Sequence, residues 1–182
     1  VIVLANGASR MPSIRRNSTN CKQFCKALRW LMLELAKAVV RDGERVTKFV
    51  TVKVEGARTY LDAKKVAEAV CKSALVKASW NGGDPNWGRI IHAVGYSQAR
   101  IREELVDIHI GGKAACLGGL QAETPMNELR DIVAHSEFEI VINLNQGEAD
   151  YIMYSSDLSP EYIDFNRSEY AYWKQARKDG LV

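Results

Sequence analysis

The stretch at residues 50–55 reads Val-Thr-Val-Lys-Val-Glu, with an apolar side chain at every second position. Successive side chains of a β-strand point to opposite faces of its sheet, so this alternation predicts a half-buried strand. Residues 106–110 and residues 138–142 alternate in the same way. A further strand is expected at residues 149–154, and the turn signal at residues 145–147 predicts that it pairs with the strand at 138–142 as a hairpin.

Amphipathic helices are expected between these strands. From Lys22 to Arg41 apolar residues recur every three or four positions, which predicts one long helix that ends at Gly43 in the left-handed conformation. Further helices are expected at residues 62–77, 85–93 and 124–135. The apolar stripe of the first helix is expected to lie in a packed core and consists of Phe24, Leu28, Leu31 and Leu35.

The mixture of helices with strands joined by short turns defines the fold class. Short turns connect antiparallel strands only, so the sequence predicts an α/β or α+β protein with one face of each sheet on a core and helices outside. The 182 residues, 47% hydrophobic and 26% charged, suit a single domain over residues 1–182. The first five residues, Val1–Ala5, have the pattern of the second half of a buried strand, so we expect the chain to be a piece of a longer protein.

Charge, hydropathy and cysteine usage exclude several classes of function. A net charge of +3 with one tight basic group argues against a nucleic-acid partner. The longest apolar stretch, residues 28–40, is interrupted by charges and is too short to span a membrane. The cysteines and histidines lack the spacing of a metal site, so no metal is expected, and buried or half-buried thiols favour the cytoplasm. The four cysteines are Cys21, Cys25, Cys71 and Cys116.

Three local features are candidates for function, and each has a structural alternative. Glu44 directly follows Gly43, where its carboxylate could bind a substrate amine or could be an ordinary solvated loop acid. Residues 84–89 read Asp-Pro-Asn-Trp-Gly-Arg, which could belong to a site or could anchor a loop, with Arg89 satisfying carbonyl groups. Asn166, in a polar tail that follows a short helical turn at residues 159–160, has no functional indication when taken alone.

Together these motifs resemble a known family. In order, they are Val-Ile-Val-Leu-Ala-Asn-Gly at residues 1–7, Arg-Asp-Gly-Glu at 41–44 followed by Thr-Lys, Gly-Asp-Pro-Asn-Trp-Gly-Arg-Ile at 83–90, and Asp-Leu-Ser-Pro-Glu-Tyr at 157–162 leading to Asn166. At these spacings the chain resembles the β chain of ornithine acetyltransferase, the bifunctional glutamate N-acetyltransferase family of arginine biosynthesis.

The resemblance implies a fold like that of the N-terminal-nucleophile hydrolases, a layered sandwich of sheets between helices. The precursor cuts itself before a Thr, which becomes the nucleophile at the start of the β chain. That Thr is expected on an upstream segment and the oxyanion donors on an α chain, so no catalytic residue is expected in this chain, which by itself is expected to be inactive.

The resemblance also implies the reaction and its partners. The acetyl group passes from N-acetylornithine to glutamate through an acyl-threonine intermediate, with no cofactor, in a cytoplasmic heterotetramer of two α and two β chains. Glu44 and Asn166 match substrate-binding positions of the family. Whether acetyl-CoA is also a donor is left open by the sequence.

The tail departs from the family pattern, and two other functions stay open. The family closes soon after its Asn with a Tyr and a terminal hydroxyl residue, whereas this chain continues from Asn166 to Val182, and Ser168 is only a nearby hydroxyl. One alternative is a relative of the same fold with amide-hydrolase or other acyl-transfer chemistry. The other is a noncatalytic anion-binding module that uses Arg10, Arg15 and Arg16.

Overall fold

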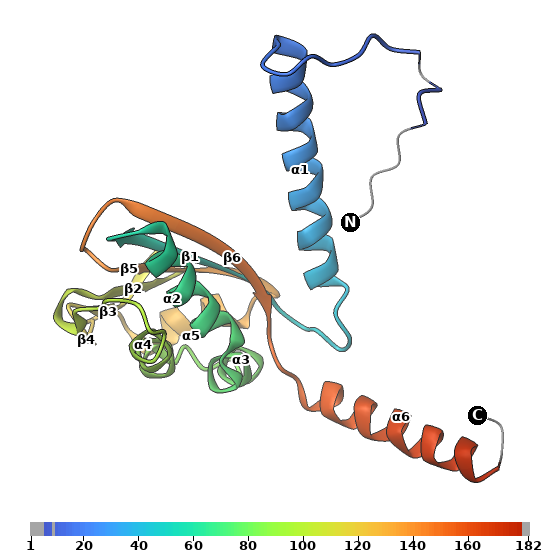
Figure 1. Ribbon diagram of the computed structural model, residues 1–182. Coiled ribbons are helices and arrows are strands. Elements are labelled where there is room, and N and C mark those ends of the chain that lie inside the picture. Colours follow the sequence, from blue (N-terminus) through green and yellow to red (C-terminus); the bar gives the residue numbers. More distant parts are fainter. Residues whose placement is uncertain (1–5, 9, 180–182) are drawn as a thin grey trace. The chain divides into compact units, whose positions relative to one another are not determined.

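The computed structural model describes residues 6–8 and 10–179 (Figure 1). The chain divides into two compact units, residues 1–42 and residues 43–182, and each is described by itself. The strand expected at Val1–Ala5 lies outside the described residues, and the single domain over residues 1–182 stays a prediction.

The first unit contains the long helix that the periodicity predicts, α1 (Thr19–Arg41). The prediction that its apolar stripe is buried in a core is wrong, because α1 has no buried residue and Leu31 is 47% exposed. Periodicity identifies an apolar face but not what covers it, and α1 is the only regular element of its unit among the described residues. The expected left-handed Gly43 is also wrong: Asp42 caps α1, and the positive φ, 55°, falls on Arg45.

The second unit is built on one six-stranded mixed sheet in the order β4-β3-β2-β5-β1-β6. Only β1 and β5 pair in parallel, and the other neighbours are antiparallel. The strands are β1 (Phe49–Ala57), β2 (Asp107–Ile110), β3 (Lys113–Leu117), β4 (Leu120–Gln121), β5 (Glu137–Asn143) and β6 (Ala149–Ser156).

The expected hairpin between β5 and β6 is wrong. Strand β6 pairs with β1, in a register that sets Phe49 opposite Ser156, and β1 lies between β5 and β6. Alternation of apolar and polar residues predicts that a strand exists, but it does not predict which strand pairs with it in the sheet. Because β1 and β6 run antiparallel, the residues just before β1 and just after β6 meet at one end of the sheet.

Five α-helices and one 3₁₀ turn, Glu103–Leu105, complete the described part of the second unit. The single helix expected at residues 62–77 is broken at Ser73, which has extended backbone and whose hydroxyl caps the next helix at the Val76 amide. The short helical turn expected to start at Ser159-Pro160 does start there, but it continues as a helix of 19 residues. The helices are α2 (Tyr60–Lys72), α3 (Ala74–Asn81), α4 (Trp87–Gly95), α5 (Met126–Ala134) and α6 (Pro160–Lys178).

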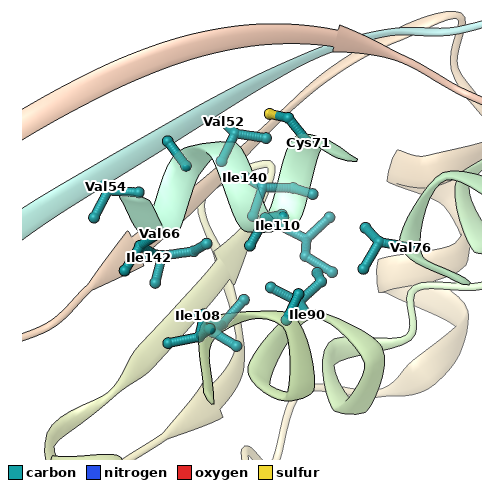
Figure 2. Close-up of a cluster of buried hydrophobic side chains, with 14 of the residues drawn as sticks. Val52, Val54, Val66, Cys71, Val76, Ile90, Ile108, Ile110, Ile140 and Ile142 are labelled. Atoms are coloured by element: carbon teal, nitrogen blue, oxygen red, sulfur yellow. The ribbon is translucent and has the colours of Figure 1, made fainter. Parts of the chain in front are cut away.

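The core of the second unit lies against one face of the sheet (Figure 2). Side chains from β1, β2 and β5 meet side chains from α2, α3 and α4 there, as Val52, Val66 and Ile90 illustrate. The opposite face is half-exposed and polar, with Lys53 Nζ 2.6 Å from a Glu139 carboxylate oxygen. The expected α/β class, with helices layered on a sheet, is confirmed.

Gly56 is needed at a bulge near the end of β1, and its replacement tests the fold. Its φ is +65°, and a Cβ would lie 2.3 Å from Asn143 Oδ1 and 2.9 Å from the Asn145 amide nitrogen. Gly83 has the same φ with no atom within 4 Å of its Cβ position. We expect Gly83→Ala to cost about 1–2 kcal/mol of backbone strain and Gly56→Ala to cost roughly 1–3 kcal/mol more through overpacking. Urea unfolding of the two variants measures the difference, and equal losses would contradict the clash.

Candidate functional site

The candidate site begins with Glu44, in the loop that leads into β1. The Glu44 side chain is exposed, and the loop turns back on itself through a hydrogen bond of 3.2 Å from the Val46 amide to the Gly43 carbonyl. As the sequence predicts, Glu44 is not part of the core. Its carboxylate is therefore available to a ligand, provided that the loop is held in place.

A buried carboxylate holds this loop. Asp157 follows β6 and is 4% exposed. It accepts hydrogen bonds from the amide and the hydroxyl of Thr47, at 2.9 and 2.5 Å. It also accepts the Lys48 amide at 3.0 Å and the Asn81 side-chain amide at 2.8 Å. Both carboxylate oxygens are thus used, and the start of β1, the end of β6 and the end of α3 are joined at one point.

Opposing effects set the pKa of Asp157. Burial raises the pKa of this carboxyl, but the hydrogen bonds from Thr47, Asn81 and Lys48 stabilise the ionised form and together bring the pKa below its ordinary value. Asp157 is therefore a carboxylate at neutral pH, and it accepts the four contacts in its ionised form.

Lys48 anchors the same loop from the other side. Its side chain is buried, and Nζ donates to the carbonyls of Val133, Ala134 and His135 at 2.6, 3.3 and 3.3 Å. These carbonyls are at the C-terminal end of α5, where the helix leaves acceptors unpaired and its dipole favours a cation. The Thr47-Lys48 pair of the motif is thus a structural support for the loop that contains Glu44.

The second candidate, Asn166, lies on α6, whose first turn is joined to the same loop. Ser159 is buried, and its hydroxyl donates to the Arg45 carbonyl at 2.8 Å and accepts the Tyr162 amide at 3.1 Å as the cap of α6. The Arg45 guanidinium carbon lies 5.4 Å from the centre of the Phe165 ring. Arg45 follows Glu44 and Phe165 precedes Asn166, so the structure brings the two candidate segments together through their neighbours.

The polar side chains of α6 are partly used within the helix. Asn166 is exposed, and its Nδ2 donates to the Tyr162 carbonyl at 2.8 Å. The Ser168 hydroxyl donates to the Phe165 carbonyl at 2.7 Å. Asn166 therefore presents its carbonyl oxygen from a helix surface, and its role in binding stays a prediction.

The Asp-Pro-Asn-Trp-Gly-Arg motif has the structural function that the sequence allowed. Asn86 donates to Asp84 at 2.9 Å, and its Oδ1 accepts the Arg89 amide at 3.0 Å to cap α4. Arg89 Nη1 donates to the Leu75 carbonyl at 2.8 Å. The helix begins at Trp87, so Pro85 precedes it and is not in its first turn as predicted. The motif fixes the turn between α3, which contributes Asn81 to the Asp157 contacts, and α4.

No group of three or more potential metal-ligating side chains occurs in the part of the chain that the structure describes. Cys71 and Cys116 are buried and Cys21 is half-buried, but Cys25 is exposed, contrary to the prediction, because it lies on α1, which has no buried residue. Burial raises the pKa of the Cys71 thiol to about 12, which leaves it protonated and unreactive. Among the described helices, none combines the length and the apolar character that crossing a membrane requires.

The sequence gives Asp157 no role of its own and gives Ser159 only the start of a helical turn, yet both residues hold this arrangement together. Asp157 and Ser159 belong to the fourth motif, but their partners, Thr47 and Arg45, are more than a hundred positions away. Only the antiparallel pairing of β1 with β6 brings the two segments together. Both segments belong to the motifs through which the chain resembles the family, and this was the sign in the sequence that they are important.

The fold and the site define a mixed α/β protein with helices packed on its sheet. The loop that contains the exposed carboxylate of Glu44 is fixed at one end of this sheet. Residues 1–171 match the model of the ArgJ family. The chain is 42% identical over 167 residues to the arginine biosynthesis bifunctional protein ArgJ of Syntrophotalea carbinolica. It is 40% identical over 175 residues to the glutamate N-acetyltransferase of Methanocaldococcus jannaschii. Each alignment covers 91% of this chain and 42% of the relative, so the chain spans less than half the length of these curated relatives.

A solved structure agrees with the sequence relatives. The crystal structure of the arginine biosynthesis bifunctional protein ArgJ from Bacillus halodurans matches with a TM-score of 0.86 and 32% identity. The match covers 92% of this chain and 79% of that chain. The chain belongs to the ArgJ family, and both the resemblance and the fold class that the motifs indicate are confirmed.

Proposed function

We propose that this chain is the greater part of the β chain of an acetyltransferase that moves an acetyl group from N-acetylornithine to glutamate. The family assignment supports this reaction, because the relatives are named for arginine biosynthesis and for glutamate N-acetyl transfer. The observation that carries the proposal is the position of Glu44, whose exposed carboxylate lies in a loop fixed by Asp157 and Lys48. Its role as a substrate-binding residue, which the resemblance implies, is part of the proposal.

The proposed chemistry proceeds in two steps. The hydroxyl of a Thr on the upstream segment attacks the acetyl carbonyl of N-acetylornithine, with the neighbouring α-amino group as base, and the amide nitrogen leaves with a proton as ornithine. The amine of glutamate then attacks the acyl-threonine ester, takes the acetyl group and returns the hydroxyl. Glu44 binds a substrate ammonium group through charge-assisted hydrogen bonds. The α chain supplies the oxyanion donors, and the assembly is a cytoplasmic heterotetramer without a cofactor.

A label-transfer assay tests the reaction. N-acetylornithine with an isotopically labelled acetyl group is incubated with glutamate and the complete enzyme, which contains the α chain and the nucleophile. Labelled N-acetylglutamate is the expected product, and the 182-residue chain alone is expected to form none. Hydrolysis of the label to free acetate, without transfer, would favour the amide-hydrolase alternative and contradict the proposal.

Glu44→Gln in the complete enzyme separates a binding role from a solvated loop acid. We expect kcat/KM to fall by about tenfold or more, because the charge that binds the ammonium group is lost. The free energy of unfolding should change by less than about 1 kcal/mol, since Glu44 is exposed. Steady-state kinetics and a thermal melt of the same variant measure both quantities.

Glu148→Gln provides the matched control. Glu148 is also exposed, in the turn between β5 and β6, and its replacement should leave kcat/KM unchanged. Equal kinetics for wild type, Glu44→Gln and Glu148→Gln would remove Glu44 from the site.

A further inference from the structure

Arg45 has an unusual backbone for its residue type. Its φ of 55° is in the left-handed region, which costs a non-glycine residue about 1–2 kcal/mol. The surrounding structure fixes this conformation, because the buried Ser159 hydroxyl donates to the Arg45 carbonyl at 2.8 Å. Strained residues of this kind persist where neighbouring contacts determine them, and they cluster at binding sites. The backbone of Arg45, from which the side chain starts, is therefore held by the fold.

The Arg45 side chain is also held at its end. Its guanidinium carbon lies over the Phe165 ring at 5.4 Å, a cation–π contact that engages the face of the guanidinium. The five N–H donors of a guanidinium lie in its plane and match the two oxygens of a carboxylate. Among the ion pairs of the described residues, none involves Arg45. The side chain is thus a positioned cation in an exposed place.

The neighbours of Arg45 point to its ligand. Glu44 precedes it, and Phe165 connects it to Asn166, so the guanidinium lies where the two candidate substrate segments meet. An anion and a cation on consecutive residues, without a salt bridge between them, suit a ligand that has both charges. Amino acids are such ligands, and N-acetylornithine, ornithine and glutamate all have an α-carboxylate.

We propose that Arg45 binds the α-carboxylate of the amino-acid substrate and thereby selects amino acids over simple amines. This inference rests on the proposed function, which supplies the substrate class. Phe165 is a positioning residue, since its ring contacts the Arg45 guanidinium. Arg45 therefore determines specificity, and the nucleophile acts on the acetyl group that this contact aligns.

Matched ligands with and without the carboxylate test the inference on the complete enzyme. N-acetylornithine is compared with N-acetylputrescine, which has the same acetylated chain without the carboxylate. We expect Arg45→Gln to lower kcat/KM for N-acetylornithine by about tenfold to a hundredfold, the range for a lost hydrogen bond to a charged group, and to leave kcat/KM for N-acetylputrescine unchanged. Arg45→Lys should retain part of the preference for N-acetylornithine over N-acetylputrescine, and Phe165→Leu should weaken this preference. Arg130→Gln, on the exposed surface of α5, is the control.

Calorimetric binding of ornithine and putrescine separates this inference from the reaction. Wild type should bind ornithine more tightly, and Arg45→Gln should lose the difference; Arg45→Lys provides the same comparison if Arg45→Gln does not fold. An enzyme that keeps this Arg45-dependent preference but transfers no acetyl group would overturn the proposed reaction and support the carboxylate contact. If Arg45→Gln loses the same affinity for ornithine and for putrescine, or loses no affinity for either ligand, the assignment of Arg45 is overturned.

Discussion

Asp157→Ala is expected to lower the free energy of unfolding by about 3 kcal/mol, because it leaves buried and partly buried hydrogen-bond donors without their acceptor. The amides of Thr47 and Lys48 both lose their carboxylate partner, and the Asn81 amide loses its own. The loop that contains Glu44 then loses its carboxylate anchor and keeps the contacts of Lys48 and Ser159. We therefore also expect a loss of at least about tenfold in kcat/KM in the complete enzyme, from misplacement of a binding group. Urea unfolding and steady-state kinetics measure the two effects.

Asp157→Asn separates the charge from the shape and provides a pH test. The folded-state pKa of Asp157 is below its unfolded value, so its ionisation stabilises the fold fully above about pH 4. This stability is lost as the pH falls through the lower, folded-state pKa. The difference in unfolding free energy between wild type and Asp157→Asn should therefore be constant from pH 7 to about pH 5 and shrink in more acidic solution. A difference that does not depend on pH would show that the charge has no role.

Ile140→Ala is expected to lower the free energy of unfolding by about 2–5 kcal/mol, the range for removing a buried aliphatic side chain. Ile140 is fully buried in the central strand β5, between β1 and β2, and little relaxation is possible there. Leu31→Ala, on α1, should change the stability of the 182-residue chain by less than about half a kcal/mol, since Leu31 is 47% exposed. Similar losses from both substitutions would contradict the exposure of the α1 stripe.

The sequence predicts those features of the fold that depend on local pattern. Alternation at Val50, Val52 and Val54 predicts β1, and all three side chains are buried. The Asp-Pro-Asn-Trp-Gly-Arg motif predicts a fixed turn, and Arg89 binds the carbonyl that this interpretation requires. Such features are determined by side-chain periodicity and by hydrogen bonds over a few positions.

The features that the sequence does not predict depend on distant partners. Ser73 is a local exception: it breaks a helix whose apolar periodicity continues across it, because its hydroxyl caps α3 at the Val76 amide three residues away. The stripe of α1 has the same pattern as a buried helix, although only a packing partner would bury it. The pairing of β1 with β6 brings Asp157 to Thr47 and Lys48, where it holds the loop that contains Glu44. Nothing within ten residues of Asp157 indicates its contact with Thr47.

The parallel pairing of β1 with β5 has a consequence for the order of folding. Phe49 lies opposite Glu137, so β1 cannot take its place in the sheet until the strands, turns and helices between them have been synthesised. Because a chain is synthesised at about 5–20 residues per second, β1 stays unpaired for several seconds on the ribosome. Contacts between such distant residues also form slowly. During that time the three valines of β1 are exposed and can associate with other chains. We expect Lys53 and Glu55, the charges that alternate with these valines, to oppose aggregation of the unpaired strand in the nascent protein.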